Sequence, residues 1–109
     1  MKLLYIIVND GFSDEVLDLL DKSGAGRATI IPARGWSGKA VFPAVPAEPA
    51  KEIVISVVSD AVGTDIAYKI NLAGYLRFAA NGMAISMDIA DVNSLKKFVK
   101  DGESEEEKV

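Results

Sequence analysis

The sequence predicts an α+β fold in which one antiparallel sheet carries two helices on a single face. Four apolar runs typical of strands alternate with two segments of helical period, in the order β-α-β-β-α-β. That order is the split β-α-β arrangement of the ferredoxin-like sandwich. With 109 residues, half of them hydrophobic, the chain suits one domain with its own core. We therefore expect a single domain over residues 1–100 and an acidic, flexible tail over residues 101–109.

The first strand is predicted over residues 3–8, a continuous apolar run that the turn Asn9-Asp10-Gly11 ends. Such a run is typical of a central strand that is buried on nearly both faces. It is too short for a secretory signal or for a membrane span, which needs about 18 apolar residues. We therefore expect a cytoplasmic protein that does not insert into membranes.

The first helix is predicted over residues 14–22. Ser13 occupies the N-cap position, and two acidic residues follow in the first turn, where carboxylates suit the helix dipole. A glycine, Gly24 or Gly26, then ends the helix.

The second and third strands are predicted over residues 28–33 and 53–58, on either side of a long loop. Prolines at positions 43, 46 and 49 favour an extended, polyproline-like path and prevent sheet pairing there. Because the strands on both sides belong to one sheet, the stretch over residues 36–50 is predicted to be a loop within one domain.

The second helix is predicted to have Asp60 or Thr64 as its cap and to end near Asn71 or Gly74, and its apolar residues keep the helical period. The fourth strand is predicted over residues 83–87. A short C-terminal helix follows, which Asp91 can cap. Its apolar residues are Val92, Leu95, Phe98 and Val99.

One face of such a sheet has no helix to cover it. The predicted strands are apolar on both faces, and exposed apolar patches larger than a few hundred Å² are rare in monomers. We therefore expect a homo-oligomer that packs sheet against sheet. The formal charge of −4 arises largely from the tail, so broad binding of nucleic acid is not expected.

Several short motifs give the chain a resemblance to a known family. The run "GAGRATIIPARG" places Thr29 in the second strand and Arg34-Gly35 at the base of the loop. The run "ANGMAISMDIADV" places Asn81-Gly82 before the fourth strand. In this order and spacing, the motifs resemble those of the PII-like signalling proteins, short-loop members of the superfamily of nitrogen regulatory protein PII.

The resemblance implies a homotrimeric regulatory protein that is not an enzyme. ATP or ADP would bind in the clefts between subunits, as a possible ligand and not as an obligatory cofactor. The loop over residues 36–50 would reshape on binding and contact a target protein, such as a transporter or a metabolic enzyme. By position, the implied ligand-binding residues are Ile7, Thr29, Arg34, Gly35, Gly38, Lys39, Val57, Asn81, Gly82 and Met83. Of these, Thr29 and Val57 would line the cleft from the opposite side.

The chain departs from that family at several positions. Met83 stands where the family usually has a lysine that contacts the phosphates, and Trp36-Ser37-Gly38-Lys39 replaces its Phe-Gly-Arg-Gln. The glutamine that helps to hold Mg²⁺ and 2-oxoglutarate is therefore missing, as is the pair of arginines after the fourth strand. The loop also has no tyrosine to uridylylate. We expect no 2-oxoglutarate sensing of the usual kind and no metal site.

From the residues alone, these positions have alternative interpretations. Asn81-Gly82 can offer backbone N–H groups to a phosphate, or it can simply form a tight turn. Arg34 and Lys39 can bind an anion, or they can remain solvated.

The remaining candidate residues also have alternative interpretations. Trp36 and Phe42 can anchor a partner protein, as aromatic hot spots do, or they can fold back onto the oligomer. Arg27 and Arg77 are weaker candidates for anion binding, since isolated surface cations are common.

Two other classes of function compete with the regulator. One is a trimeric interaction module that binds a partner without any ligand. The other is an enzyme of the acylphosphatase type, which would need an arginine in an anion-binding loop after the first strand, where this chain has the acidic turn Asn9-Asp10-Gly11. Asp88 and Asp91 can hold Mg²⁺ or transfer protons, but ending a strand and capping a helix is the simpler interpretation.

Overall fold

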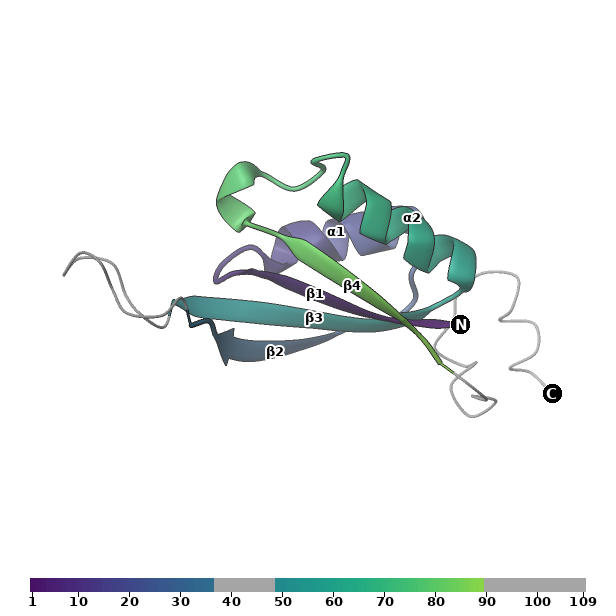
Figure 1. The fold of residues 1–109 in the computed structure, drawn as a ribbon, viewed down its shortest axis with the longest axis horizontal. Coiled ribbons are helices and arrows are strands. Elements are labelled where there is room, and N and C mark those ends of the chain that lie inside the picture. The colour runs from purple at the N-terminus through teal and green to yellow at the C-terminus, as the bar shows by residue number, and fades with distance from the viewer. Residues whose placement is uncertain (37–48, 90–109) are drawn as a thin grey trace.

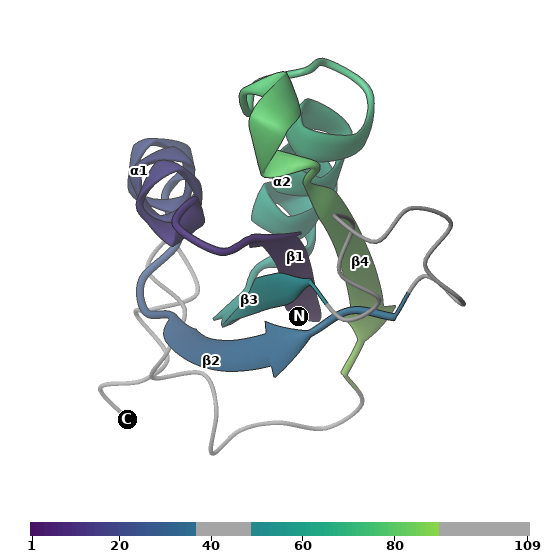
Figure 2. The same ribbon diagram turned by 90° about the vertical axis from the view of Figure 1, so that its left-hand side faces the viewer.

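The computed structural model describes residues 1–36 and 49–89. They form a four-stranded antiparallel sheet with both helices on one face (Figure 1), and Figure 2 shows the helices side by side above it. The predicted α+β, ferredoxin-like fold is therefore confirmed. The elements are β1 Lys2–Asn9, α1 Ser13–Ser23, β2 Thr29–Arg34, β3 Ala50–Val58, α2 Asp60–Asn71, the 3₁₀ turn η1 Phe78–Ala80, and β4 Met83–Asp88.

The sheet has the strand order β2-β3-β1-β4, and every neighbouring pair is antiparallel. The continuous apolar run of β1 therefore lies between two hydrogen-bonded neighbours, as the sequence predicts. β2 and β4 form the two edges.

The core lies between the sheet and the helices. Leu4, Ile6 and Val8 of β1 are completely buried, because alternate side chains of a strand point to the same face. Val54 of β3 and Ile66 of α2 are equally inaccessible. Burying one such side chain stabilises the fold by about 1.5–3 kcal/mol, so this layer holds both helices against one face of the sheet.

The opposite face of the sheet, which we call the open face, is apolar. No described helix packs on it, and its side chains keep part of their surface accessible: Met83 is 48% exposed and Met87 is 42% exposed. The strand register places on this face Leu3, Tyr5, Ile7, Asn9, Thr29, Ile31, Ala33, Lys51, Ile53, Ile55, Val57, Met83, Ile85 and Met87. Among residues 1–36 and 49–89, nothing covers this broad apolar surface.

The start of α1 differs from the prediction. Ser13 is the first residue of the helix instead of its cap. The Glu52 carboxylate on β3 takes the capping role, because its Oε1 accepts the backbone N–H groups of Ser13 and Gly11 at 3.2 and 2.9 Å. The end of the helix agrees with the prediction, since Gly24 has the left-handed conformation at φ 92°.

The cap of α2 is also different from the prediction. The hydroxyl of Ser59, not Asp60 or Thr64, accepts the backbone N–H of Val62 at 3.3 Å. Asp60 instead receives the N-terminal ammonium group at 2.9 Å. The helix ends at Asn71, as predicted.

The remaining predictions for the chain fall outside the described residues. These are most of the loop over residues 36–50, the short helix after Asp91 and the tail over residues 101–109.

Candidate ligand-binding site at the loop end of the sheet

One end of the sheet, which we call the loop end, lies where β2 ends at Arg34 and β3 begins at Ala50 (Figure 1). These two residues pair with each other. Beyond them, the backbone N–H of Gly35 donates to the carbonyl of Pro49 at 2.8 Å, and the N–H of Asp10 donates to the carbonyl of Ala50 at 3.2 Å. Backbone hydrogen bonds thus join the two ends of the loop to each other and to the turn after β1.

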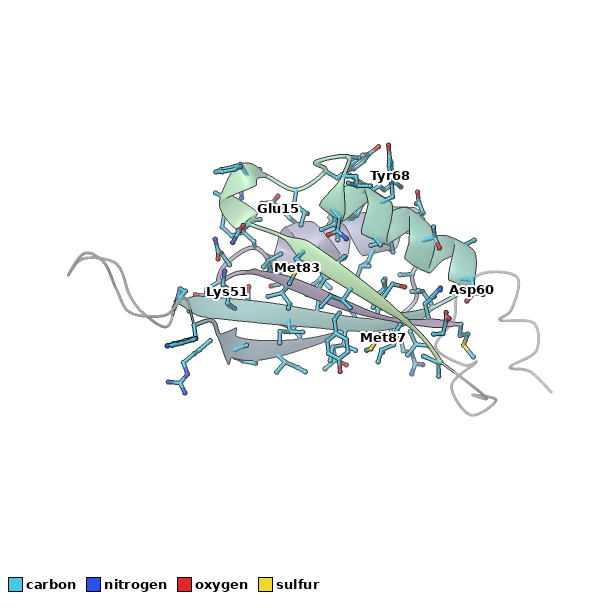
Figure 3. All side chains as sticks on the ribbon, viewed as in Figure 1. Glu15, Lys51, Asp60, Tyr68, Met83 and Met87 are labelled. Carbon is cyan, nitrogen blue, oxygen red and sulfur yellow. The ribbon has the colours of Figure 1, made fainter. Side chains whose placement is uncertain are left out.

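The next two residues of β3 point to opposite faces of the sheet. Glu52 faces the helices, where it caps α1. The strand register places Lys51, labelled in Figure 3, on the open face. Its Nζ donates a hydrogen bond to Oδ1 of Asn9 at 2.6 Å. Its stem packs on Gly35, where an added Cβ would lie 3.1 Å from Lys51 Cε. The close approach of the Lys51 side chain therefore explains the glycine at position 35.

Asn9 extends this contact to the turn before β4. Its Nδ2 donates to the carbonyl of Ala79 in η1 at 2.9 Å. Asn81 follows with φ 48°, a conformation that asparagine adopts more readily than most residues. At Gly82, an added Cβ would lie 2.6 Å from Cδ1 of Leu76. The tight turn itself thus explains both residues, and phosphate binding by this turn stays a prediction.

The predicted ligand residues fall into two groups. The first gathers at the loop end and comprises Ile7, Arg34, Gly35, Asn81, Gly82 and Met83. The second group is Thr29 and Val57, on β2 and β3. Val57 pairs with Leu3, four residues along β1 from Ile7, which is about 14 Å at ~3.4 Å per residue. A single chain does not bring the two groups together.

Three predicted residues, Gly38, Lys39 and Phe42, lie outside the described residues. Trp36 is described and is 77% exposed. Its role as a partner anchor stays a prediction.

Arg77 lies against α1 and not on the open face. Its Nε donates to Oε2 of Glu15 at 2.6 Å, and its backbone N–H donates to Oε1 at 3.2 Å. Its guanidinium also stacks over the ring of Phe12, 4.9 Å from the ring centroid. The hydrogen bond from Arg77 holds the pKa of the Glu15 carboxyl below its usual value. Arg77 therefore ties the segment before η1 to the first turn of α1.

The other charged candidates are also away from the loop end. Asp88 ends β4, as the simpler interpretation predicts, and accepts a hydrogen bond from Nζ of Lys2 at 2.6 Å. This contact raises the pKa of Lys2. Arg27 precedes β2 at the opposite end of the strand, where its carbonyl accepts the Ser56 hydroxyl at 2.6 Å. Asp91 lies outside the described residues.

Sequence reasoning missed Asn9 and Lys51 as residues of the loop end. The available signal was alternation, because Lys51 continues the period of two set by Ile53 and Ile55 and must share their face. It also missed Phe78, which is fully exposed in η1.

Two absences hold for the described part of the chain, residues 1–36 and 49–89. None of its helices has the length and apolar character needed to cross a bilayer. It also contains no group of three or more side chains arranged to hold a metal ion.

Comparisons of sequence find no relatives. A scan against models of protein families gives no match, and a search of curated proteins gives no significant match.

Comparisons of structure do find similar proteins. A PII-like signalling protein from Thermus thermophilus matches with a TM-score of 0.67 and 22% identity, over 90% of this chain and 94% of that one. CutA1 from Pyrococcus horikoshii matches at 0.66 and 18%, over 90% and 94%. The PII-like protein CPII from Thiomonas intermedia, bound to ADP, AMP and bicarbonate, matches at 0.59 and 24%, over 81% and 88%. The chain therefore has the fold that PII-like signalling proteins and CutA1 share, and the resemblance drawn from its motifs is confirmed for the fold.

Proposed function

We propose that this chain is a homotrimeric regulatory protein, and not an enzyme, that binds an adenine nucleotide between its subunits. The observation that carries the proposal is the separation of two predicted ligand residues, Ile7 and Val57, on an apolar face that no described helix covers. Ile7 and Val57 are about 14 Å apart in one chain, so they line one small cleft only when they come from different copies.

The open face supports the assembly. Its exposed side chains include Met83, Ile85 and Met87, each more than two-fifths accessible. Burial of apolar surface contributes about 25 cal/mol per Å², and exposed apolar patches of this kind mark protein contacts. Further copies of the chain, packed sheet against sheet, would remove this surface from water.

The choice of ligand rests on the chemistry of the loop end. Arg34 offers a guanidinium suited to phosphate, and the Asn81-Gly82 turn lies at the same end of the sheet. Among the structural neighbours, CPII was solved with ADP and AMP bound. Nucleotide binding is therefore the first property to test.

Signalling would pass through the loop over residues 36–50. A ligand shifts the populations of loop conformers only if it makes different contacts in each, and Arg34 lies where the loop joins the sheet. The exposed Trp36 would then contact a target protein, such as a transporter or a metabolic enzyme. We place this activity in the cytoplasm, and nitrogen regulation is the pathway that the resemblance suggests.

Isothermal titration calorimetry with ATP, ADP, cyclic nucleotides and bicarbonate, one at a time, tests the proposal. We expect binding of at least one adenine nucleotide at micromolar to millimolar concentration. An absence of heat with every nucleotide at millimolar concentration would remove the proposal.

Arg34→Ala tests where the nucleotide binds. Because charge-assisted hydrogen bonds contribute about 1.5–3 kcal/mol, we expect the dissociation constant of the nucleotide to rise by at least about tenfold. Lys22→Ala, on the exposed side of α1, is the matched control and should bind as the wild type does. Equal affinities of all three proteins would show that the cleft has been assigned wrongly.

The second candidate is a trimeric interaction module that works without a ligand. Met83 favours it, because an apolar side chain occupies the position of the phosphate-binding lysine of the family that the chain resembles. A trimer that gives no heat with any nucleotide but still binds a partner through its loop would establish this alternative.

A further inference from the structure

Lys51 holds a distinctive position on the sheet. The strand register puts it on the open face, whereas Lys2 and Arg34 belong to the opposite face. It is therefore the only lysine or arginine that the four strands place on the open face. Figure 3 shows it at the loop end, at the start of β3.

The ammonium group of Lys51 is held by a neutral partner. Its Nζ lies 2.6 Å from Oδ1 of Asn9, in a partly buried contact. No carboxylate of the described residues lies within salt-bridge distance of it, although Lys2, Lys22 and Lys69 each have one. The charge of Lys51 is thus oriented but not neutralised within the described part of the chain.

The contacts of Lys51 join two parts of the predicted site. Its stem packs on Gly35 at the loop base. Through Asn9, which donates to the carbonyl of Ala79, it is linked to the turn that precedes β4. Met83 lies on the same face, two strands across from Lys51 and two residues further along, since it pairs with Ile7 of the strand between them. The ammonium group therefore lies on the same face, and toward the same end of the sheet, as the position where the resembled family has its phosphate-binding lysine.

Assembly of several copies would change the surroundings of the Lys51 ammonium group. If further copies cover the open face, Lys51 becomes more deeply buried, and a buried cation without an anion is unfavourable. A hydrogen bond to a neutral amide does not compensate for that loss of hydration. An oxyanion placed between the loop base and the turn before β4 would do so.

We propose that Lys51 binds a phosphate oxygen of the ligand. It would thereby take the role of the phosphate-binding lysine of the resembled family, whose position Met83 occupies in this chain. Asn9 is then the positioning residue, because it fixes the direction of the ammonium group before the ligand arrives. This inference rests on the proposed nucleotide site and names the cation that recognises the phosphate in it.

The test compares ADP with adenosine, which lacks the phosphates. Lys51→Gln keeps a donor for Asn9 and removes the charge. We expect it to weaken ADP binding by at least about tenfold and to leave adenosine binding within about twofold, whereas Lys51→Arg retains ADP binding within about threefold. Lys22→Gln, on the exposed side of α1, is the matched control and should not change either affinity.

The outcomes separate the two proposals. If the wild type binds no adenine nucleotide, the proposed function fails. If it binds ADP and Lys51→Gln binds ADP equally well, or loses ADP and adenosine to the same extent, the proposed function stands and the role of Lys51 is wrong.

A second measurement uses the wild-type protein and does not depend on how a variant folds. Lysines are acetylated with an N-hydroxysuccinimide ester, and the extent of reaction at each is read by mass spectrometry. We expect ADP, but not adenosine, to slow the acetylation of Lys51 several-fold and to leave Lys22 unaffected. If ADP slows the acetylation of Lys51 no more than adenosine does, the proposal is overturned.

Discussion

Glu15 shows how a single charge links segments that are distant in the sequence. Its carboxylate accepts two hydrogen bonds from Arg77, one from the side chain and one from the backbone. The pair stabilises the folded state only while the carboxylate is ionised. Because its pKa is lower in the folded than in the unfolded state, this contribution is present above the unfolded pKa and is lost as pH falls through the folded pKa.

Glu15→Gln should therefore have an effect that depends on pH. Near pH 7 we expect it to lower the melting temperature by no more than about 5 °C, since partly exposed ion pairs contribute little. As pH falls below about 4.3, the usual pKa of a glutamate, the melting temperatures of variant and wild type should converge. Thermal denaturation followed by circular dichroism between pH 7 and pH 3 measures this. A difference that stays constant over this range would show that the ionised pair is not its source.

The caps of both helices differ from the prediction, each for its own physical reason. Ser13 has the right chemistry for a cap, but it is the first residue of α1, and its own backbone N–H donates to Glu52, 39 residues away on β3. No residue near Ser13 in the sequence indicates that Glu52 is its partner. Ser59 lies directly before Asp60, and both residue types are common helix caps. The sequence pattern alone does not show which of the two caps the helix.

At the scale of elements, the turn between η1 and β4 depends on close packing. Gly82 leaves room for Leu76, and an added methyl group would lie 2.6 Å from its Cδ1 atom. Leu76 is partly buried against the core. The glycine is therefore explained by a neighbour within the chain, whether or not a ligand binds there.

Gly82→Ala is expected to destabilise the protein by about 1–3 kcal/mol, the usual cost of overpacking. Urea denaturation measures the change in the free energy of unfolding. In the background of Leu76→Ala the same substitution should cost clearly less, because the clashing atom is gone. Additive effects of the two substitutions would show that this contact is not the cause.

The elements themselves could be predicted from the sequence because their signals are local. The alternation and β-branched residues of β3 and the glycine after α1 act within a few residues. The site could be predicted only in part. Arg34 and Gly35 were placed at the loop base by a motif, whereas the contact between Lys51 and Asn9 spans 42 residues and follows from the register of β1 with β3.

For the whole molecule, we propose that the open face decides the state of assembly. Ile55 lies near its centre, between Thr29 and Tyr5 in the register. Ile55→Lys would place a charge where we propose that copies meet, and desolvating that charge is strongly unfavourable.

We expect light scattering of the wild type to give three times the chain mass of 11.6 kDa, and Ile55→Lys to give the mass of one chain. Leu72→Lys is the matched control, since Leu72 is a 78% exposed apolar residue outside the open face. It should leave the mass unchanged. A wild type that scatters as a single chain would contradict the trimer and, with it, the shared cleft.

The closure of the loop end has a practical consequence for protein engineering. The hydrogen bond from Gly35 to Pro49 and the pairing of Arg34 with Ala50 hold β2 and β3 in register. These two contacts involve no residue of the segment 37–48. The segment over residues 37–48 is therefore a natural place for grafting a foreign peptide. Doubling the length of an insert would cost only about 0.6 kcal/mol in closure entropy. A trimer would display three copies of each insert, so such chimeras would serve as compact scaffolds for multivalent epitopes.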